Sequence, residues 1–165
     1  MTDRFAVRLA TADDIPRISR HRAEMFADMG QLPSDLYAKL IACTSEYLAE
    51  ALPAGTYVAW LAMPASDPGN VVAGAGVQLR RTLPHPLTRN ESRKIATGRQ
   101  AIVLNVFTER PWRRQGLAAL LMAQVIEWAR RSEVETLVLH SSAEGRALYE
   151  RLGFVPTTEM RLADL

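Results

Sequence analysis

The segment between residues 101 and 140 constrains the fold most. It contains an apolar run at 101–108, a basic turn, a long periodic stretch at 115–131 and a second short apolar run at 135–140. Within the periodic stretch, leucine and other apolar residues recur at helical spacing, which predicts an amphipathic helix. A strand, a helix and a second strand in this order form a βαβ crossover, which places two parallel strands in one sheet.

The remainder of the chain predicts hairpins and further helices. A strand is expected at 5–9, helices from Ile15 to Gly30 and from about 34 to 52, strands at 56–63 and 71–79, a helix at 143–152, and terminal strand pieces at 154–155 and 159–162. Hairpins combined with one crossover predict an α/β (α+β) chain: a mixed, mostly antiparallel central sheet flanked by helices on both faces.

Size and composition favour one domain and exclude several classes of protein. The chain has 165 residues and a net charge of +2, so we expect residues 1–165 to form a single domain. Its single cysteine, Cys43, excludes an internal disulfide framework and a CxxC-type zinc site, and we expect no metal. The first twenty residues lack a signal-peptide layout and no apolar run reaches about 18 residues, so a cytoplasmic protein without a membrane span is expected.

The turn between the strand at 101–108 and the following helix has the chemistry of an anion site. The first turn of a helix exposes unpaired N–H groups at the positive end of its dipole. Arg113, Arg114 and the side-chain-free Gly116 make this helix start a candidate diphosphate cradle. The spacing matches neither GxxxxGK[ST] nor GxGxxG, and a solvated basic helix start is the alternative.

Two motifs give this arrangement a family resemblance. Arg113-x-x-Gly116-x-Ala118 resembles motif A of the GCN5-related N-acetyltransferases, and the tail from Leu148 to Phe154 resembles the second family hallmark, Leu-Tyr-x-x-x-Gly-Phe. The resemblance implies an acyl-CoA N-acyltransferase-like fold and acetyl-CoA as cosubstrate. It implies direct transfer of the acetyl group to a primary amine of a small molecule or peptide. The alternative is a non-catalytic acyl-CoA-binding or sensor module on the same fold.

The resemblance also implies roles for individual residues. Arg113 opens the motif. The backbone N–H groups that follow it would hold the pyrophosphate of acetyl-CoA, and they belong to Arg114, Gln115, Gly116, Leu117, Ala118 and Ala119. The strand before the turn, usually bulged in this family, would pair with pantetheine and direct one N–H to the thioester oxygen through Val106, Phe107 and Thr108. Tyr149 would protonate the leaving thiolate. Ser142 stands where many members have an asparagine that contacts pantetheine.

The acceptor side carries no comparable motif. Glu109, Glu24 and Asp28 are candidate bases, but each is expected to be a solvated surface acid, and a water chain or a neutral amine is the alternative. His21 has no ligand-spaced partner. Dimers are common among proteins of this kind, so a homodimer is possible.

Residues 80–99 are predicted to form a long arginine-rich loop. The loop is either a solvated segment or a lid that attracts an anionic acceptor or the 3′-phosphate of coenzyme A. It has no interleaved aromatic residues on which bases could stack, so a nucleic-acid partner is not expected.

Overall fold

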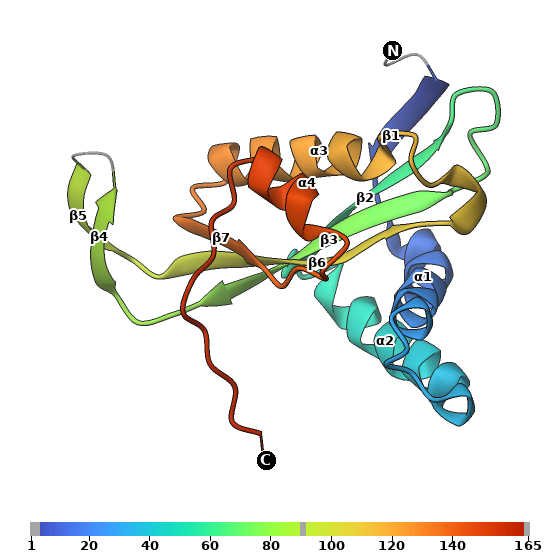
Figure 1. The fold of residues 1–165 in the computed structure, drawn as a ribbon, viewed down its shortest axis with the longest axis horizontal. Helices are drawn as coiled ribbons and strands as arrows, with labels where there is room; N and C mark the ends of the chain where they lie inside the picture. Colours follow the sequence, from blue (N-terminus) through green and yellow to red (C-terminus); the bar gives the residue numbers. More distant parts are fainter. Residues whose placement is uncertain (1–3, 90–91, 164–165) are drawn as a thin grey trace.

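The computed structural model describes residues 4–89 and 92–163, and it contains the predicted mixed sheet (Figure 1). Five strands lie in the order β1-β2-β3-β6-β7, antiparallel except for the β6–β7 pair. Their bounds are Phe5–Leu9 (β1), Tyr57–Pro64 (β2), Ala73–Arg81 (β3), Arg99–Thr108 (β6) and Thr136–Leu139 (β7). The predicted fold class is therefore confirmed, including the crossover that makes β6 and β7 parallel.

Helices cover both faces of the sheet, and each face has its own core. Among the described residues, the α-helices are Ile15–Asp28 (α1), Tyr37–Ala51 (α2), Leu117–Arg131 (α3) and Arg146–Arg151 (α4). Leu121, Met122 and Val125 of α3 pack on one face of the sheet, and Ile18 of α1 with Leu48 of α2 pack on the other. The two clusters share no residue because alternate side chains of each strand point to opposite faces.

The predicted loop at 80–99 is wrong in part, because it contains a two-stranded hairpin. Strands His85–Arg89 (β4) and Ser92–Ala96 (β5) pair with each other and extend away from the main sheet (Figure 1). Pro86 lies in β4, whose second edge pairs with no strand among the described residues. A proline there interrupts no hydrogen-bond ladder, so the prolines of this segment did not exclude a strand. Residues 90 and 91 of the predicted loop lie outside the described residues.

The predicted terminal strand pieces at 154–155 and 159–162 are also wrong. The described part of the tail contains no strand, and Val155, Met160 and Leu162 are 74%, 94% and 69% exposed. Their alternation suggested a strand, but no neighbouring strand supplies the hydrogen bonds that a strand requires. Among the described residues, no helix has the length and hydropathy needed to cross a bilayer.

Candidate active site

Strand β6 is bulged and then loses one of its neighbours. Leu104 pairs with Gly76 and Phe107 pairs with Gly74, so two residues, Asn105 and Val106, oppose Ala75 alone. Asn105 adopts a left-handed backbone with φ of 57°, which asparagine tolerates better than most residues. The pairing with β7 ends at Val103, so in the described structure no strand covers the other edge of 104–108. That free edge contains Val106, Phe107 and Thr108, the positions assigned to the donor thioester.

A buried hydrogen-bond chain fixes the bulge from the α1 side. Nδ2 of Asn105 donates to the hydroxyl of Tyr57 at 2.9 Å, and the Arg22 guanidinium donates to Oδ1 of Asn105. Burial raises the pKa of Tyr57 to about 12, so its hydroxyl stays protonated while it accepts this bond. The bulge residue is therefore held by its side chain as well as its backbone. No sequence motif indicates this chain, because its members lie on three separate elements.

The turn after β6 presents a group of unpaired backbone donors. A short 3₁₀ turn, Arg110–Trp112, leads to Arg114 and Gly116, which have positive φ angles of 63° and 85°. Gly116 starts α3 without a side-chain cap, and the first backbone bond into it runs from Leu120 N–H to the Gly116 carbonyl. Within the described residues, no partner accepts from the N–H groups of Arg114, Gln115, Gly116, Leu117, Ala118 and Ala119. These residues, 114–119, are called the N–H cradle below, and an anion satisfies such donors.

The side chain of Arg113 does not lie over the N–H cradle. Its Nε donates to the Thr108 carbonyl at 2.9 Å, its guanidinium lies over the Phe107 ring at 5.6 Å, and it forms an ion pair with Asp28. Arg110 pairs with the same carboxylate at 2.6 Å. These hydrogen bonds, that of Arg113 first, lower the pKa of Asp28, so this carboxylate stays charged and ties the end of α1 to the turn.

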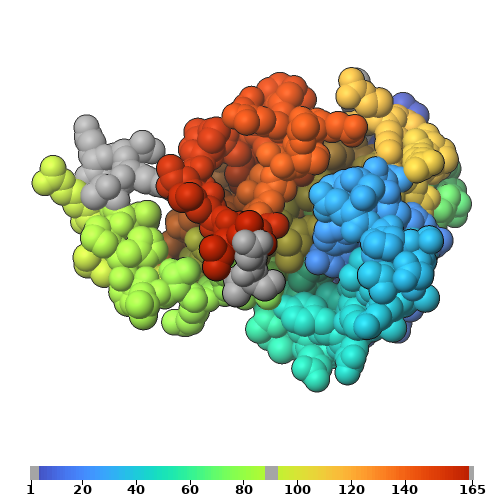
Figure 2. Space-filling view, turned by 60° about the horizontal axis from the view of Figure 1, so that its bottom comes forward, coloured from blue at the N-terminus to red at the C-terminus, as the bar shows by residue number. Residues whose placement is uncertain are grey.

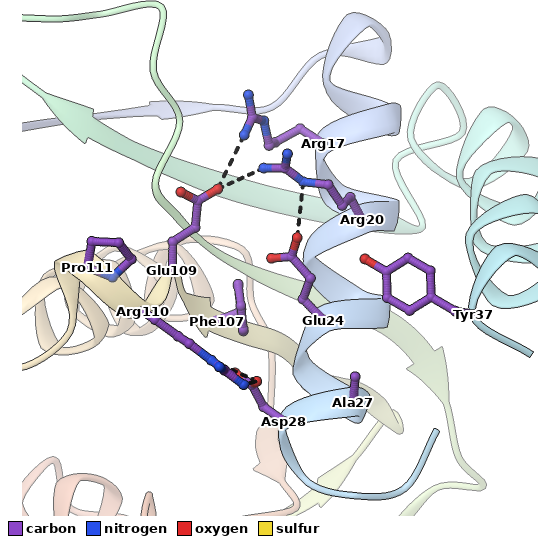
Figure 3. A pocket seen from close by; sticks show the side chains of 10 residues that line it. All are labelled: Arg17, Arg20, Glu24, Ala27, Asp28, Tyr37, Phe107, Glu109, Arg110 and Pro111. Atoms are coloured by element: carbon purple, nitrogen blue, oxygen red, sulfur yellow. Dashed lines mark hydrogen bonds and ion pairs between the residues drawn. The ribbon is translucent and has the colours of Figure 1, made fainter. Parts of the chain in front are cut away.

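A pocket of about 540 Å³ opens between α1 and the end of β6 (Figure 3). Figure 2 shows this face of the molecule hollowed between α1 and the C-terminal segments. Phe107 of β6 lies behind the charged side chains (Figure 3). Charged groups of both signs line the rest, together with Tyr37, Ala27 and Pro111: Arg17, Arg20, Arg110, Glu24, Asp28 and Glu109. The volume lies within the range typical of small-molecule sites, about 300–1,000 Å³.

Glu109 gathers three groups of α1 on one oxygen. Its Oε1 lies 3.2 Å from Arg17, 2.7 Å from Arg20 and 3.1 Å from Nε2 of His21. Burial is the main cause that lowers the pKa of His21, so the ring is neutral and its Nε2–H donates to Glu109. Nδ1 of His21 is then a buried acceptor without a partner in the described structure.

The expectation that Glu109, Glu24 and Asp28 are solvated surface acids is wrong for Glu109 and Glu24, which are half-buried, whereas Asp28 is an exposed residue whose carboxylate is held in ion pairs. The side chains of Glu109 and Asp28 are 22% exposed and that of Glu24 is 34% exposed, and each lies within ion-pair distance of arginine. The residues around β6 give no indication that Glu109 contacts side chains about ninety positions earlier in the sequence. The signal that was available is the charged stripe along α1, whose residues recur at helical intervals: Arg17, Arg20, His21, Glu24 and Asp28.

Tyr149 and Ser142 lie on the α3 side of the sheet, away from the pocket wall built by α1. Tyr149 belongs to α4, is half-buried against the core that contains Leu117, and contacts Phe154 edge to face with ring centroids 6.0 Å apart. Burial raises the pKa of Tyr149, so its hydroxyl holds a proton at neutral pH. Oγ of Ser142 accepts from the Gly145 N–H at 3.1 Å, which leaves its own hydroxyl proton free to donate.

Comparison with known proteins places these features in context. Residues 23–154 match the family model described as the acetyltransferase (GNAT) family. The GCN5-related N-acetyltransferase from Ralstonia eutropha JMP134 is 26% identical, with a TM-score of 0.82 over 96% of this chain and 97% of that one. A predicted acetyltransferase from Clostridium acetobutylicum, solved with acetyl-CoA, shares the fold at 24% identity, with a TM-score of 0.78 over 97% of this chain and 96% of that one.

A third solved structure shares the fold at lower identity. The glucosamine-6-phosphate N-acetyltransferase from Arabidopsis thaliana is 13% identical, with a TM-score of 0.66 over 96% of each chain. No curated protein sequence matches the chain.

Proposed function

The chain belongs to the acetyltransferase (GNAT) family, and on that premise we propose that it transfers the acetyl group of acetyl-CoA to a primary amine of a small molecule or peptide. Members of the family use acetyl-CoA, and one solved relative holds it. The observation that carries the proposal is the N–H cradle: six consecutive unpaired N–H groups directly after a bulged strand with a free edge. We assign the whole chain, 1–165, to one domain that performs this reaction.

The donor fits the described residues in two places. The N–H cradle offers its donors to the pyrophosphate, at the positive end of α3. The free edge of Val106, Phe107 and Thr108 offers backbone groups to the pantetheine amides, and the Ser142 hydroxyl can add one donor. The Arg113 guanidinium, held by Asp28 and the Thr108 carbonyl, supports the turn and adds positive charge beside it.

Two substrates can meet at the bulge from opposite faces of the sheet. The N–H cradle and Tyr149 lie on the side of the sheet that α3 covers. Phe107, in the bulged part of β6, lines the pocket on the side that α1 covers. Acetyl-CoA supplies a thioester whose carbonyl carbon is open to an amine. An amine in the pocket would attack this carbon, the C–S bond would break, one proton would leave the nitrogen and one would be taken up by sulfur.

Each proton and charge has a candidate group in this chain. One backbone N–H of the segment Val106, Phe107 and Thr108 stabilises the negative charge that develops on the carbonyl oxygen. Tyr149 donates its hydroxyl proton to the sulfur. Glu24 is the pocket carboxylate with the weakest arginine contact, 3.4 Å from Arg20 Nε and not aligned as a hydrogen bond, so it can accept the proton of the amine.

Two measurements test this function. Isothermal titration should give saturable binding of acetyl-CoA, and a thiol reagent should detect release of coenzyme A that depends on an added amine. Absence of acetyl-CoA binding by folded protein would overturn the proposal. Binding without amine-dependent release for any amine tested would instead identify a non-catalytic acyl-CoA-binding module.

A further inference from the structure

Ion pairs between arginines and a carboxylate lie at both ends of the pocket. At one end, the guanidinium groups of Arg17 and Arg20 share a single carboxylate, Glu109. At the other end, Arg110 and Arg113 share Asp28. Each of these two carboxylates is thus shared by two guanidinium groups, of which that of Arg113 lies outside the pocket lining. Glu24 lies between the two ends, one helical turn beyond Arg20 (Figure 3).

The end formed by Arg17, Arg20 and Glu109 is called the Arg17–Arg20 end below. Its two guanidinium groups have N–H donors that do not contact Glu109. A guanidinium carries five N–H donors. Each arginine reaches Glu109 with one nitrogen, and both meet the same oxygen, Oε1. The side chains of Arg17 and Arg20 line the pocket and are 33% and 42% exposed, so both keep accessible N–H groups there, although Nε of Arg20 is buried. Planar pairs of such donors match the oxygens of a carboxylate or a phosphate.

The opposite end is committed to another role. Arg110 and Arg113 flank the turn that leads into the N–H cradle, which the proposed function assigns to the donor. The Arg17–Arg20 end and Glu24 are thus the charged groups left for the acceptor. They comprise two guanidinium groups and two carboxylates, and one of these carboxylates, Glu24, has no aligned hydrogen-bond donor in the described structure.

We propose that the acceptor is a primary amine that also carries an anionic group, a carboxylate or a phosphate. The Arg17–Arg20 end binds the anion, and Glu24 receives the ammonium before it loses its proton. This inference rests on the proposed function and names the substrate class of the same site. A polycationic amine is disfavoured, because its additional ammonium groups would meet the guanidinium groups of Arg17, Arg20 and Arg110, which line the pocket and already pair with its carboxylates Glu109 and Asp28.

Matched amine pairs test the inference, since the two members of a pair differ in the anionic group. Glucosamine 6-phosphate with glucosamine forms the phosphate arm, β-alanine with propylamine forms the carboxylate arm, and spermidine represents polycations. We expect kcat/KM to be at least tenfold higher for the anionic member in one arm, which identifies the anion. The ratio should fall with added salt, because partly exposed charges are screened.

Variants locate the anion site. Arg17→Gln and Arg20→Gln should each bring the ratio close to one, whereas Arg130→Gln, an exposed arginine on α3, should keep it. Circular dichroism and thermal unfolding confirm that each variant is folded. A ratio that survives both substitutions would show that the anion binds elsewhere and would overturn the assignment.

The remaining outcomes separate this inference from the function on which it rests. Equal rates within both pairs, faster turnover of spermidine, or no turnover of any anionic amine would overturn the inference while acetyl-CoA binding persists. Loss of acetyl-CoA binding itself would overturn the proposed function together with the inference.

Discussion

Nε2 of His21 lies 3.1 Å from Oε1 of Glu109, and this contact joins the middle of α1 to the residue that follows β6. His21 is 2% exposed, and burial is the main cause that lowers its pKa. An unfolded histidine has a pKa of about 6.5. Below that pH the unfolded chain binds a proton that the folded chain does not, so the free energy of unfolding should decrease as pH falls.

Thermal unfolding between pH 7.5 and 5 checks this linkage. His21→Gln should flatten the decrease, because glutamine keeps a donor toward Glu109 but does not titrate. His140→Gln, at a histidine whose side chain is 49% exposed, serves as the comparison variant. Parallel pH profiles for the parent chain and His21→Gln would contradict the prediction.

Gly116→Ala should weaken acetyl-CoA binding. Gly116 has φ of 85°, and alanine in that region costs about 1–2 kcal/mol. No atom lies within 4 Å of the added Cβ, but the strain acts on the backbone of the N–H cradle, so we expect at least a tenfold loss of affinity by titration. Gly55→Ala is the matched control, with φ of 67° and equally open surroundings. It should lose similar stability and keep the affinity; equal affinities for both variants would remove the N–H cradle from donor binding.

Tyr149→Phe should lower kcat by about 10²–10⁴, the usual contribution of a positioned acid, with little change in acetyl-CoA affinity. Since burial raises the pKa of this hydroxyl, the parent enzyme should keep its acid form through neutral pH and lose activity only in the alkaline range. Stopped assays across pH 6–10 measure both effects. Tyr47→Phe, an exposed tyrosine on α2, is the control. Unchanged turnover in Tyr149→Phe would assign protonation of the thiolate to another group.

Gly76→Ala should destabilise the fold, whereas Gly74→Ala should not do so appreciably. A Cβ at Gly76 would lie 1.9 Å from the hydroxyl oxygen of Tyr57, whose ring is buried and cannot move freely. Overpacking of this kind costs about 1–3 kcal/mol. At Gly74 the nearest atom is a Leu61 methyl at 3.1 Å, which needs a small adjustment. Urea unfolding separates the two variants, and similar midpoints would show that Tyr57 relaxes without losing Asn105.

The sequence predicted the elements whose patterns are local. The helix of α3 and the strands at 5–9 and 101–108 followed from apolar periodicity. A basic turn before Gly116 indicated an anion site at the helix start, and the family resemblance supplied the residues 114–119 of the N–H cradle. The hairpin β4–β5 escaped prediction because its pairing gives no buried alternation. The tail misled for the opposite reason, since its alternation has no partner strand.

The acceptor side could not be predicted because its contacts are distant in sequence. Glu109 meets Arg20 across 89 residues, and Arg22 meets Asn105 across 83. Neither pair belongs to a sequence motif, and each of these residues is of a type that is common on protein surfaces. Which charges meet is decided by where α1 crosses β6, and that crossing depends on packing of the whole layer.

The four residues Ala73, Gly74, Ala75 and Gly76 make β3 a thin partition between the two cores. Small side chains here bring both helical layers close to the backbone that they share, and the two apolar clusters have no residue in common. Substitutions of core residues in α1 and α2 should therefore combine additively with substitutions of core residues in α3, since distant sites without common partners rarely couple. The fold is modular in this sense: under the proposed function, substitutions in the layer of α1 and α2 could change the accepted amine while the layer of α3 keeps the donor site.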